Sequence, residues 1–181
     1  MIYDVSIETL DRYCVFDLKG TRTDMASRLA GLAITLPESA NTLSRSGDIV
    51  SCWIGPTQWI LLAPETTGHE LVRKLQPNVS DAKTSVVEIS DMLQFFAVHG
   101  RDADEVLSVC CPLDTHPTAF PKNAVTFTEL SGTKALLLRD TDGFQFAVDR
   151  SYADFIDDIL HRILGTPLPI DHAGRTPGEI C

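Results

Sequence analysis

The sequence is poor in basic residues, with 15 Lys and Arg against 25 Asp and Glu and a formal net charge of −10 at pH 7. Nucleic acids and anionic membrane surfaces are bound through clustered Lys and Arg, so this balance argues against both as partners. No apolar run approaches the roughly 20 residues that a helix needs to cross a bilayer. Residues 1–8 also lack the basic and apolar regions of a secretory signal. We therefore predict a cytoplasmic chain.

Paired cysteines are absent as well. The chain has five cysteines, an odd number, and none of them forms a C-x-x-C pair. The neighbours Cys110 and Cys111 have a poor spacing for a metal site or a structural disulfide. A redox role for this pair would need an adjacent base or cation that favours a reactive thiolate, and the sequence offers none. We predict reduced thiols that act mostly as small buried apolar groups.

The motifs of common catalytic centres are missing. The chain contains no G-x-G-x-x-G, no G-x-x-x-x-G-K-[ST] and no G-x-S-x-G segment, and its five histidines form no H-x-H or H-x-x-x-H pair. The acidic run at 102–105 is expected to stabilise the start of a helix, and Asp154, Asp157 and Asp158 a solvated helix face. We therefore expect no catalytic, cofactor-binding or metal-binding residue in this chain, and the sequence leaves open whether the chain is an enzyme.

What the sequence does contain is a repeated order of elements. Hydrophobic periodicity and turn residues predict a strand, a helix, three strands and a helix over residues 10–77, at 13–19, 24–33, 41–45, 48–54, 58–63 and 67–75. The same order recurs over residues 84–165, in which strands at 85–91 and 93–99 precede a helix at 101–110, strands at 124–130, 134–139 and 144–148, and a helix at 151–164. We predict one α+β domain over residues 1–165, made of two similar halves with antiparallel sheets backed by helices. Residues 166–181 are predicted to be a Pro-rich tail, mobile or laid along a partner.

The last helix is the clearest element. Ser151 and Asp154 have the spacing of an N-terminal capping pair, and Gly165 stands where a helix should end. One face carries an apolar stripe of seven residues: Tyr152, Phe155, Ile156, Ile159, Leu160, Ile163 and Leu164. This pattern predicts a helix that packs on the core or on a partner.

Large aromatic residues provide the candidates for a partner interface. Trp53 and Trp59 could bind a ligand, but Trp59 precedes an apolar strand, where such residues are more often core or interface anchors. We predict Trp59, Phe144, Tyr152 and Phe155 as partner-interface residues.

Five segments in order resemble the sarcosine oxidase gamma subunit family. They are G-P-T-Q-W-I-L-L at 55–62, S-V-V-E-I-S-D at 85–91, F-A-V-H-G-R-D-A-D-E-V-L at 96–107, C-C-P-L-D at 110–114 with F-P at 120–121, and F-Q-F-A-V-D-R-S-Y-A-D-F at 144–155. The family is in turn similar to part of the aminomethyltransferase-like folate-binding fold, which agrees with the duplicated α+β pattern.

The resemblance implies a non-catalytic gamma subunit of a heterotetrameric sarcosine oxidase, which oxidises sarcosine to glycine in sarcosine catabolism. The implied partners are alpha, beta and delta subunits, and the implied cofactors of the complex are FAD, FMN, NAD and tetrahydrofolate, none of them bound by this chain. The K-G-x-[YF]-x-G-[QE] stretch of folate-dependent relatives is absent here.

Two alternatives remain open at this point. The chain could be a free-standing folate- or small-acid-binding module, or a minimal aminomethyltransferase-like protein, which would require a polar cleft between the halves. It could also be a purely structural homodimer.

Overall fold

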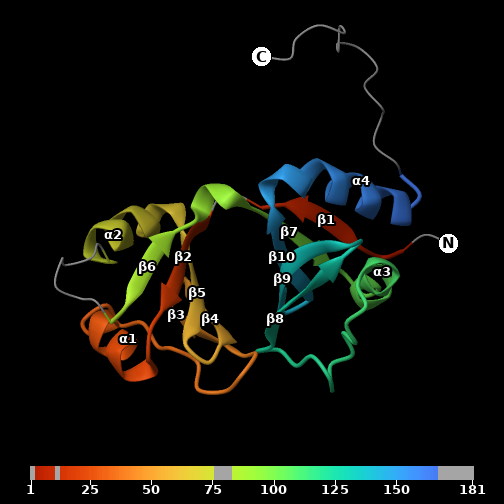
Figure 1. Ribbon diagram of the computed structural model, residues 1–181. Helices are drawn as coiled ribbons and strands as arrows, with labels where there is room; N and C mark the ends of the chain where they lie inside the picture. The colour runs from red at the N-terminus through yellow and green to blue at the C-terminus, as the bar shows by residue number, and fades with distance from the viewer. Residues whose placement is uncertain (1–2, 11–12, 76–82, 167–181) are drawn as a thin grey trace, which may run out of the picture.

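A computed structural model describes residues 3–10, 13–75 and 83–166. The described chain folds into two five-stranded antiparallel sheets (Figure 1). The first sheet has the order β3-β4-β5-β2-β6 and the second the order β1-β7-β10-β9-β8. An isolated bridge between Thr42 and Ala124 links the two sheets. The predicted α+β class with antiparallel sheets backed by helices is thereby confirmed.

The strands of the first sheet are β2 (Tyr13–Lys19), β3 (Leu43–Ser46), β4 (Ile49–Gly55), β5 (Gln58–Pro64) and β6 (Ser85–Glu88). Those of the second are β1 (Ser6–Thr9), β7 (Leu93–His99), β8 (Val125–Leu130), β9 (Thr133–Arg139) and β10 (Gly143–Asp149). The helices are α1 (Arg22–Leu29), α2 (Glu65–Leu75), α3 (Ala103–Cys110) and α4 (Ala153–Ile163), with short 3₁₀ turns η1 (Ser90–Met92) and η2 (Arg150–Tyr152).

The halves exchange their first strands. The prediction assigned residues 85–91 to the second half and no strand to residues 6–9. In the structure β6 pairs with β2 of the first sheet, whereas β1 pairs with β7 of the second. The sheets therefore do not follow the sequence boundary at residue 84. A short edge strand can hydrogen-bond to either sheet, and its own residue pattern does not specify which sheet it joins.

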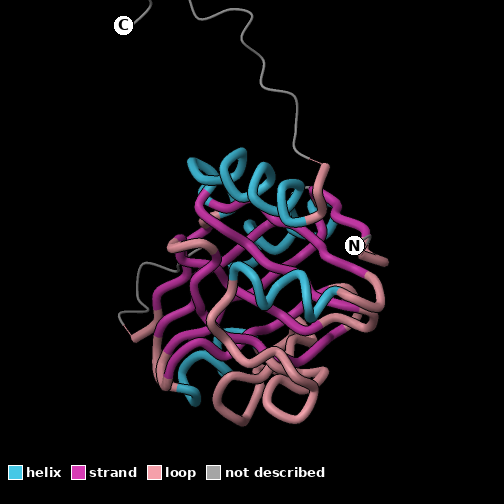
Figure 2. Tube along the Cα trace, turned by 90° about the vertical axis from the view of Figure 1, so that its right-hand side faces the viewer, coloured by secondary structure: helices cyan, strands magenta, loops and turns pink. Residues whose placement is uncertain are grey.

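Alternation along the strands divides the core into layers. In β2, Cys14, Phe16 and Leu18 pack with Met25 of α1 and Leu71 of α2, whereas Val15 faces the opposite sheet. In the second sheet, Phe96 and Val98 pack on the side of α3 and α4. The helices thus cover the outer faces of the sheets, and the inner faces form a shared core (Figures 1 and 2).

Two helix ends differ from the prediction. Helix α1 begins and ends earlier than residues 24–33, because Thr21 caps its start and a turn with Gly31 and Ala33 at positive φ follows Leu29. Ser151 does not cap α4. Its backbone N–H and its hydroxyl both donate to Asp149, which caps η2 instead. The C-terminal stop at Gly165 is confirmed by its φ of +75°.

The apolar stripe of α4 divides into two parts. Ile156 and Leu160 are buried in the core on the outer face of the second sheet, and Ala153, Ile163 and Leu164 pack against the same core. Tyr152 and Phe155 are exposed. The helix therefore packs on the core with one face and presents aromatic side chains to the surroundings with another.

Candidate functional site

The four predicted interface residues separate into two groups. Trp59 is 1% exposed and Phe144 is fully buried, each within the core between a sheet and its helices. Neither side chain can touch another protein without disrupting that core, so both serve internal packing and neither is available at the surface. Tyr152 and Phe155 are 50% and 47% exposed and are available to a partner.

Two further exposed apolar side chains lie near Tyr152. Met92 of η1 is 57% exposed and Phe127 of β8 is 39% exposed. Met92, Phe127 and Tyr152 line one groove, and Phe155 continues from Tyr152 along α4. We call these four residues the apolar surface. Burying such side chains against a partner contributes about 1.5–3 kcal/mol each before the entropic costs of binding.

The groove beside this surface lies between the two sheets and has a volume of about 600 Å³. Ile60 of the first sheet and Leu136 of the second line it, and both belong to the shared core. Its other apolar lining residues are Ile54, Ile89, Leu93 and Ala147. The free-standing binding module considered above would need a polar cleft here, and the lining is chiefly aliphatic and aromatic.

The polar groups of the groove interact with one another or with the walls. Gln58 Nε2 donates to Asp17 Oδ1 at 2.7 Å, and Lys19 Nζ lies 3.1 Å from Asp17 Oδ2. Lys134 Nζ lies 4.1 Å from the centroid of the Phe127 ring, a cation–π contact that holds this ring at the rim. The groove is thus bordered by side chains already held in place.

The chain turn that carries Tyr152 is fixed by Arg150. Its Nε donates to the carbonyl oxygen of Asp91 at 2.8 Å, and its Nη2 donates to that of Leu93 at 3.0 Å. These bonds connect η2 to η1 and to the start of β7. The two hydrogen bonds from Ser151 to Asp149 also hold the pKa of that carboxyl below its usual value. Met92 and Tyr152 are therefore presented from one hydrogen-bonded unit.

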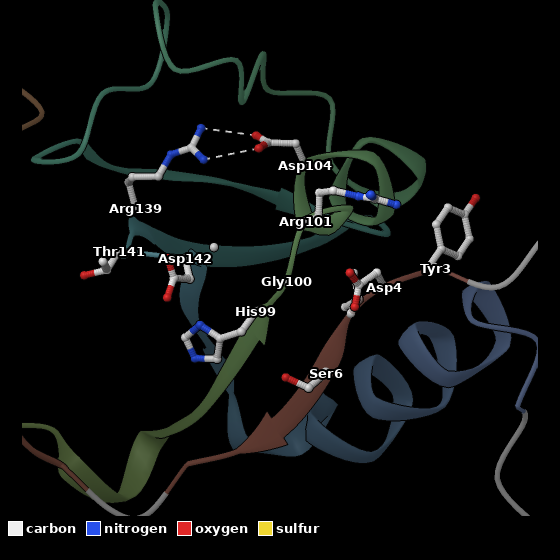
Figure 3. A pocket seen from close by; sticks show the side chains of 12 residues that line it. Tyr3, Asp4, Ser6, His99, Gly100, Arg101, Asp104, Arg139, Thr141 and Asp142 are labelled. Atoms are coloured by element: carbon white, nitrogen blue, oxygen red, sulfur yellow. Dashed lines mark hydrogen bonds and ion pairs between the residues drawn. The ribbon is translucent and has the colours of Figure 1, made fainter.

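A second, polar cavity lies at the other end of the second sheet (Figure 3). It has a volume of about 720 Å³ and is lined by Tyr3–Ser6, by residues 99–101 with Asp104, and by Arg139 and residues 141–143. The groove contains Leu93, the first residue of β7, and the cavity contains His99, the last. The two features are therefore separated by the length of a strand.

The described thiols fit structural roles. Burial raises the pKa of Cys52 to about 12, and burial together with the neighbouring Cys111 raises the pKa of Cys110 to about 11. Both are protonated at neutral pH, so they are poor nucleophiles. Cys181 lies outside the described residues. Within the described part of the chain, no group of three or more His, Cys, Asp or Glu side chains is placed to hold a metal ion.

None of the helices described is long and apolar enough to cross a membrane.

The model of the sarcosine oxidase, gamma subunit family matches residues 22–163 of this sequence. The chain belongs to this family. The match includes all four helices and strands β3 to β10, and it includes Met92, Phe127, Tyr152 and Phe155. No curated protein sequence matches the chain.

Solved structures share the fold of this chain. A chain of the heterotetrameric sarcosine oxidase from Corynebacterium sp. U-96, in complex with pyrrole 2-carboxylate, superposes with a TM-score of 0.80 at 22% identity, covering 92% of this chain and 87% of that one. The glycine cleavage system aminomethyltransferase T from Bartonella henselae superposes with a TM-score of 0.65 at 13% identity. That match covers 88% of this chain and 46% of the aminomethyltransferase, so this gamma-family chain spans less than half of it. The expected likeness to the aminomethyltransferase fold is confirmed.

The prediction from sequence missed Met92 and Phe127. Phe127 shares a strand face with the buried Val125, so its alternation alone predicts burial. Its exposure arises because Phe127 lies where the sheets separate into the groove, and no local pattern reports that position. Met92 lies in a short 3₁₀ turn, which has no apolar period to interpret.

Proposed function

We propose that this chain is the non-catalytic gamma subunit of a cytoplasmic heterotetrameric sarcosine oxidase, a complex of sarcosine catabolism. Its partners would be the alpha, beta and delta subunits, which would hold the FAD, FMN, NAD and tetrahydrofolate. The single observation that carries this proposal is the family match over both halves of the chain. Thiols with raised pKa values and the lack of a catalytic motif are consistent with a supporting role.

The apolar surface is the contact that we assign to the larger subunits. Its four side chains are exposed in the isolated chain. Contact with another subunit would bury them together, as apolar and aromatic side chains are buried at the centre of a protein interface. The hydrogen bonds of Arg150 hold two of them in place before binding, which lowers the entropic cost of association. The phenol of Tyr152 can also make a hydrogen bond at the margin of such an interface.

Co-expression with the alpha, beta and delta subunits tests this proposal. The double variant Tyr152→Asp with Phe155→Asp places two charges in the assigned interface and should remove the gamma chain from the purified complex. Val109→Asp is the matched control, because Val109 is an exposed apolar residue of α3 outside the apolar surface. This control should assemble like the wild type.

The amounts of gamma chain and flavin in the purified complex, together with the melting temperature of each isolated gamma variant, provide the measurement. A folded double variant that still assembles at the wild-type level would reject the apolar surface as the interface. Failure of the wild-type chain to co-purify with any larger subunit would reject the gamma-subunit function itself. A tetrahydrofolate titration of the lone chain, followed by Trp fluorescence, would then test the alternative of a free-standing binding module.

A further inference from the structure

The polar cavity is formed by three separate segments of the chain. The N-terminal segment supplies Asp4 and Ser6, the end of β7 supplies His99, and the turn between β9 and β10 supplies Thr141 and Asp142. Figure 3 shows the side chains of Ser6, His99 and Asp142 on the same side of these segments, around one hollow. The cavity is large enough for a small organic molecule.

Hydrogen bonds donated by backbone N–H groups hold the three segments together. Gly100 N–H donates to the carbonyl oxygen of Asp142 at 2.9 Å, and Asp4 N–H donates to Asp102 Oδ2 at 2.8 Å. A Cβ on Gly143 would lie 2.0 Å from the carbonyl oxygen of Val98, so this approach also requires glycine. The cavity walls are therefore preorganised by the fold.

The two guanidinium groups beside the cavity contact protein groups, Arg139 through several bonds and the exposed Arg101 through one. The guanidinium of Arg139 is 3.2 Å from Asp104 Oδ1, donates to the carbonyl oxygens of Thr115 and Phe120, and stacks on Phe144. Arg101 contacts Asp102 through Nε at 3.4 Å, and its side chain extends away from His99 toward Tyr3 (Figure 3). Neither guanidinium is directed at the space between Ser6, His99 and Asp142.

The remaining polar side chains of the cavity have no protein partner among the described residues, and two of them, Asp4 and Asp142, are carboxylates that only accept hydrogen bonds. Among residues 3–10, 13–75 and 83–166, no hydrogen bond or ion pair satisfies the carboxylates of Asp4 and Asp142, the ring of His99, or the hydroxyls of Ser6 and Thr141. The two carboxylates carry negative charge and only accept hydrogen bonds, and the hydroxyls can accept further hydrogen bonds. This set matches a ligand that carries N–H donors and positive charge.

The internal repeat shows that the architecture does not require these carboxylates. In the first half, Gly20 occupies the place of Gly100, since its N–H donates to the carbonyl oxygen of Thr57 and its Cβ position faces the carbonyl oxygen of Lys83. Thr57 and Lys83 thus stand where the second half has Asp142 and Asp4. The same backbone arrangement forms there with no carboxylate at either position.

We propose that this cavity binds a small organic cation bearing one or more protonated amines. The ammonium group donates to the carboxylates of Asp142 and Asp4, and Ser6 and Thr141 accept from further N–H groups. Such charge-assisted hydrogen bonds are stronger than those between neutral groups. Because the cavity and the apolar surface lie at opposite ends of β7 and β10, occupation of this site is compatible with assembly of the subunit.

Isothermal titration calorimetry of the full-length chain in an amine-free buffer tests this assignment. The probes are putrescine and spermidine, and succinate is the control of opposite charge. We expect saturable binding of at least one amine and none of succinate. Asp142→Asn and Asp4→Asn should each weaken amine binding by about 10-fold or more, the effect of losing a hydrogen bond between charged groups.

Asp48→Asn is the matched control, because it removes one exposed carboxylate from the turn between β3 and β4, and Asp48 does not line the cavity. It should bind like the wild type. Absence of saturable amine binding would overturn the proposal, as would equal affinities in Asp142→Asn and Asp48→Asn or equal binding of succinate. Melting temperatures identify a misfolded variant, and the second cavity variant then decides the outcome.

Discussion

A Cβ atom on Gly100 would lie 2.2 Å from the carbonyl oxygen of Asp4, and Gly100 has a φ of +126°. The exchanged strand β1 reaches the second sheet through this close approach. Gly100→Ala should destabilise the protein by about 3 kcal/mol, because it adds a steric clash to backbone strain. Urea unfolding measures the free energy of unfolding.

Gly47→Ala is the control, since Gly47 has a φ of +61° but no atom within 4 Å of its Cβ position. It should cost only about 1 kcal/mol, the strain of the left-handed conformation. Equal losses in the two variants would contradict the importance of the contact with Asp4.

Trp59 is expected to affect stability rather than assembly. Trp59→Ala removes a large side chain from a closed core and should cost about 3–5 kcal/mol. The indole N–H of Trp59 has no hydrogen-bond partner among the described residues, so Trp59→Phe removes an unsatisfied donor and should cost only about 1 kcal/mol. Tyr152→Ala should change stability by less than about 0.5 kcal/mol, as usual at a surface. Thermal unfolding of the isolated chain separates the three, and a large loss in Tyr152→Ala would contradict its exposed position.

Arg139 and Asp104 are unequal partners. Arg139 is 8% exposed and joins β9 to the carbonyl oxygens of Thr115 and Phe120, so Arg139→Met should cost about 3 kcal/mol by leaving buried acceptors unpaired. The Asp104 side chain is 46% exposed, so solvent screens its charge and Asp104→Asn should cost about 1 kcal/mol or less. Chemical denaturation of both variants checks this order. A greater loss in Asp104→Asn would show that the ion pair, not the carbonyl contacts, holds this region.

The raised thiol pKa values predict slow alkylation of the folded chain. Cys52 and Cys110, with pKa values of about 12 and about 11, should remain unmodified by iodoacetamide at pH 7.5 while the chain is folded. Both should react in urea. Mass spectrometry of peptides measures the modification at each cysteine, and rapid modification of Cys52 in the native chain would disprove its burial.

Asp102 predicts a pH-dependent contribution to stability. The hydrogen bond from the N–H of Asp4, with a smaller contribution from the charge and hydrogen bond of Arg101, holds the pKa of Asp102 below its unfolded value. The stabilisation is therefore fully present well above an unfolded pKa of about 3.9 and is lost as the pH falls through the lower folded pKa. Asp102→Asn should be less stable than the wild type at pH 7, and the difference should shrink toward pH 3. Urea unfolding over this pH range measures it, with Asp48→Asn as the control for loss of one charge. A difference that does not change with pH would contradict the linkage.

Much of the secondary structure could be predicted because the determining patterns are local. Strands β2 and β7 have the predicted bounds. Each is a short apolar segment that is directly followed in the sequence by a glycine, Gly20 after β2 and Gly100 after β7. The helix at Ala103–Cys110 is likewise limited by nearby residues, since Gly100 precedes it and Pro112 follows it in the sequence. The start of α4 was predicted less well because Asp149 competes with Asp154 for Ser151, and only geometry decides between them.

The candidate site was predictable only in part. Tyr152 and Phe155 were found because they belong to a strongly periodic helix, yet that period alone could not distinguish them from the buried Ile156 and Leu160. Trp59 and Phe144 are residue types that often anchor interfaces, but helices cover the faces of the sheets on which these two side chains lie. The polar cavity was not predicted at all, since it combines residues 4, 99 and 142, which no spacing rule connects.

The amino-acid sequence by itself determined the class of fold, the order of its elements and the family resemblance, because these depend on local periodicity and on motifs in order along the chain. Tertiary structure alone decided the exchange of β1 and β6, the exposure of Met92 and Phe127, and the placement of Asp4 and Asp142 around one cavity. Each of these depends on how distant segments pack against one another. Hydrogen bonding at sheet edges and the separation of two sheets are properties of the folded molecule, and no single segment encodes them.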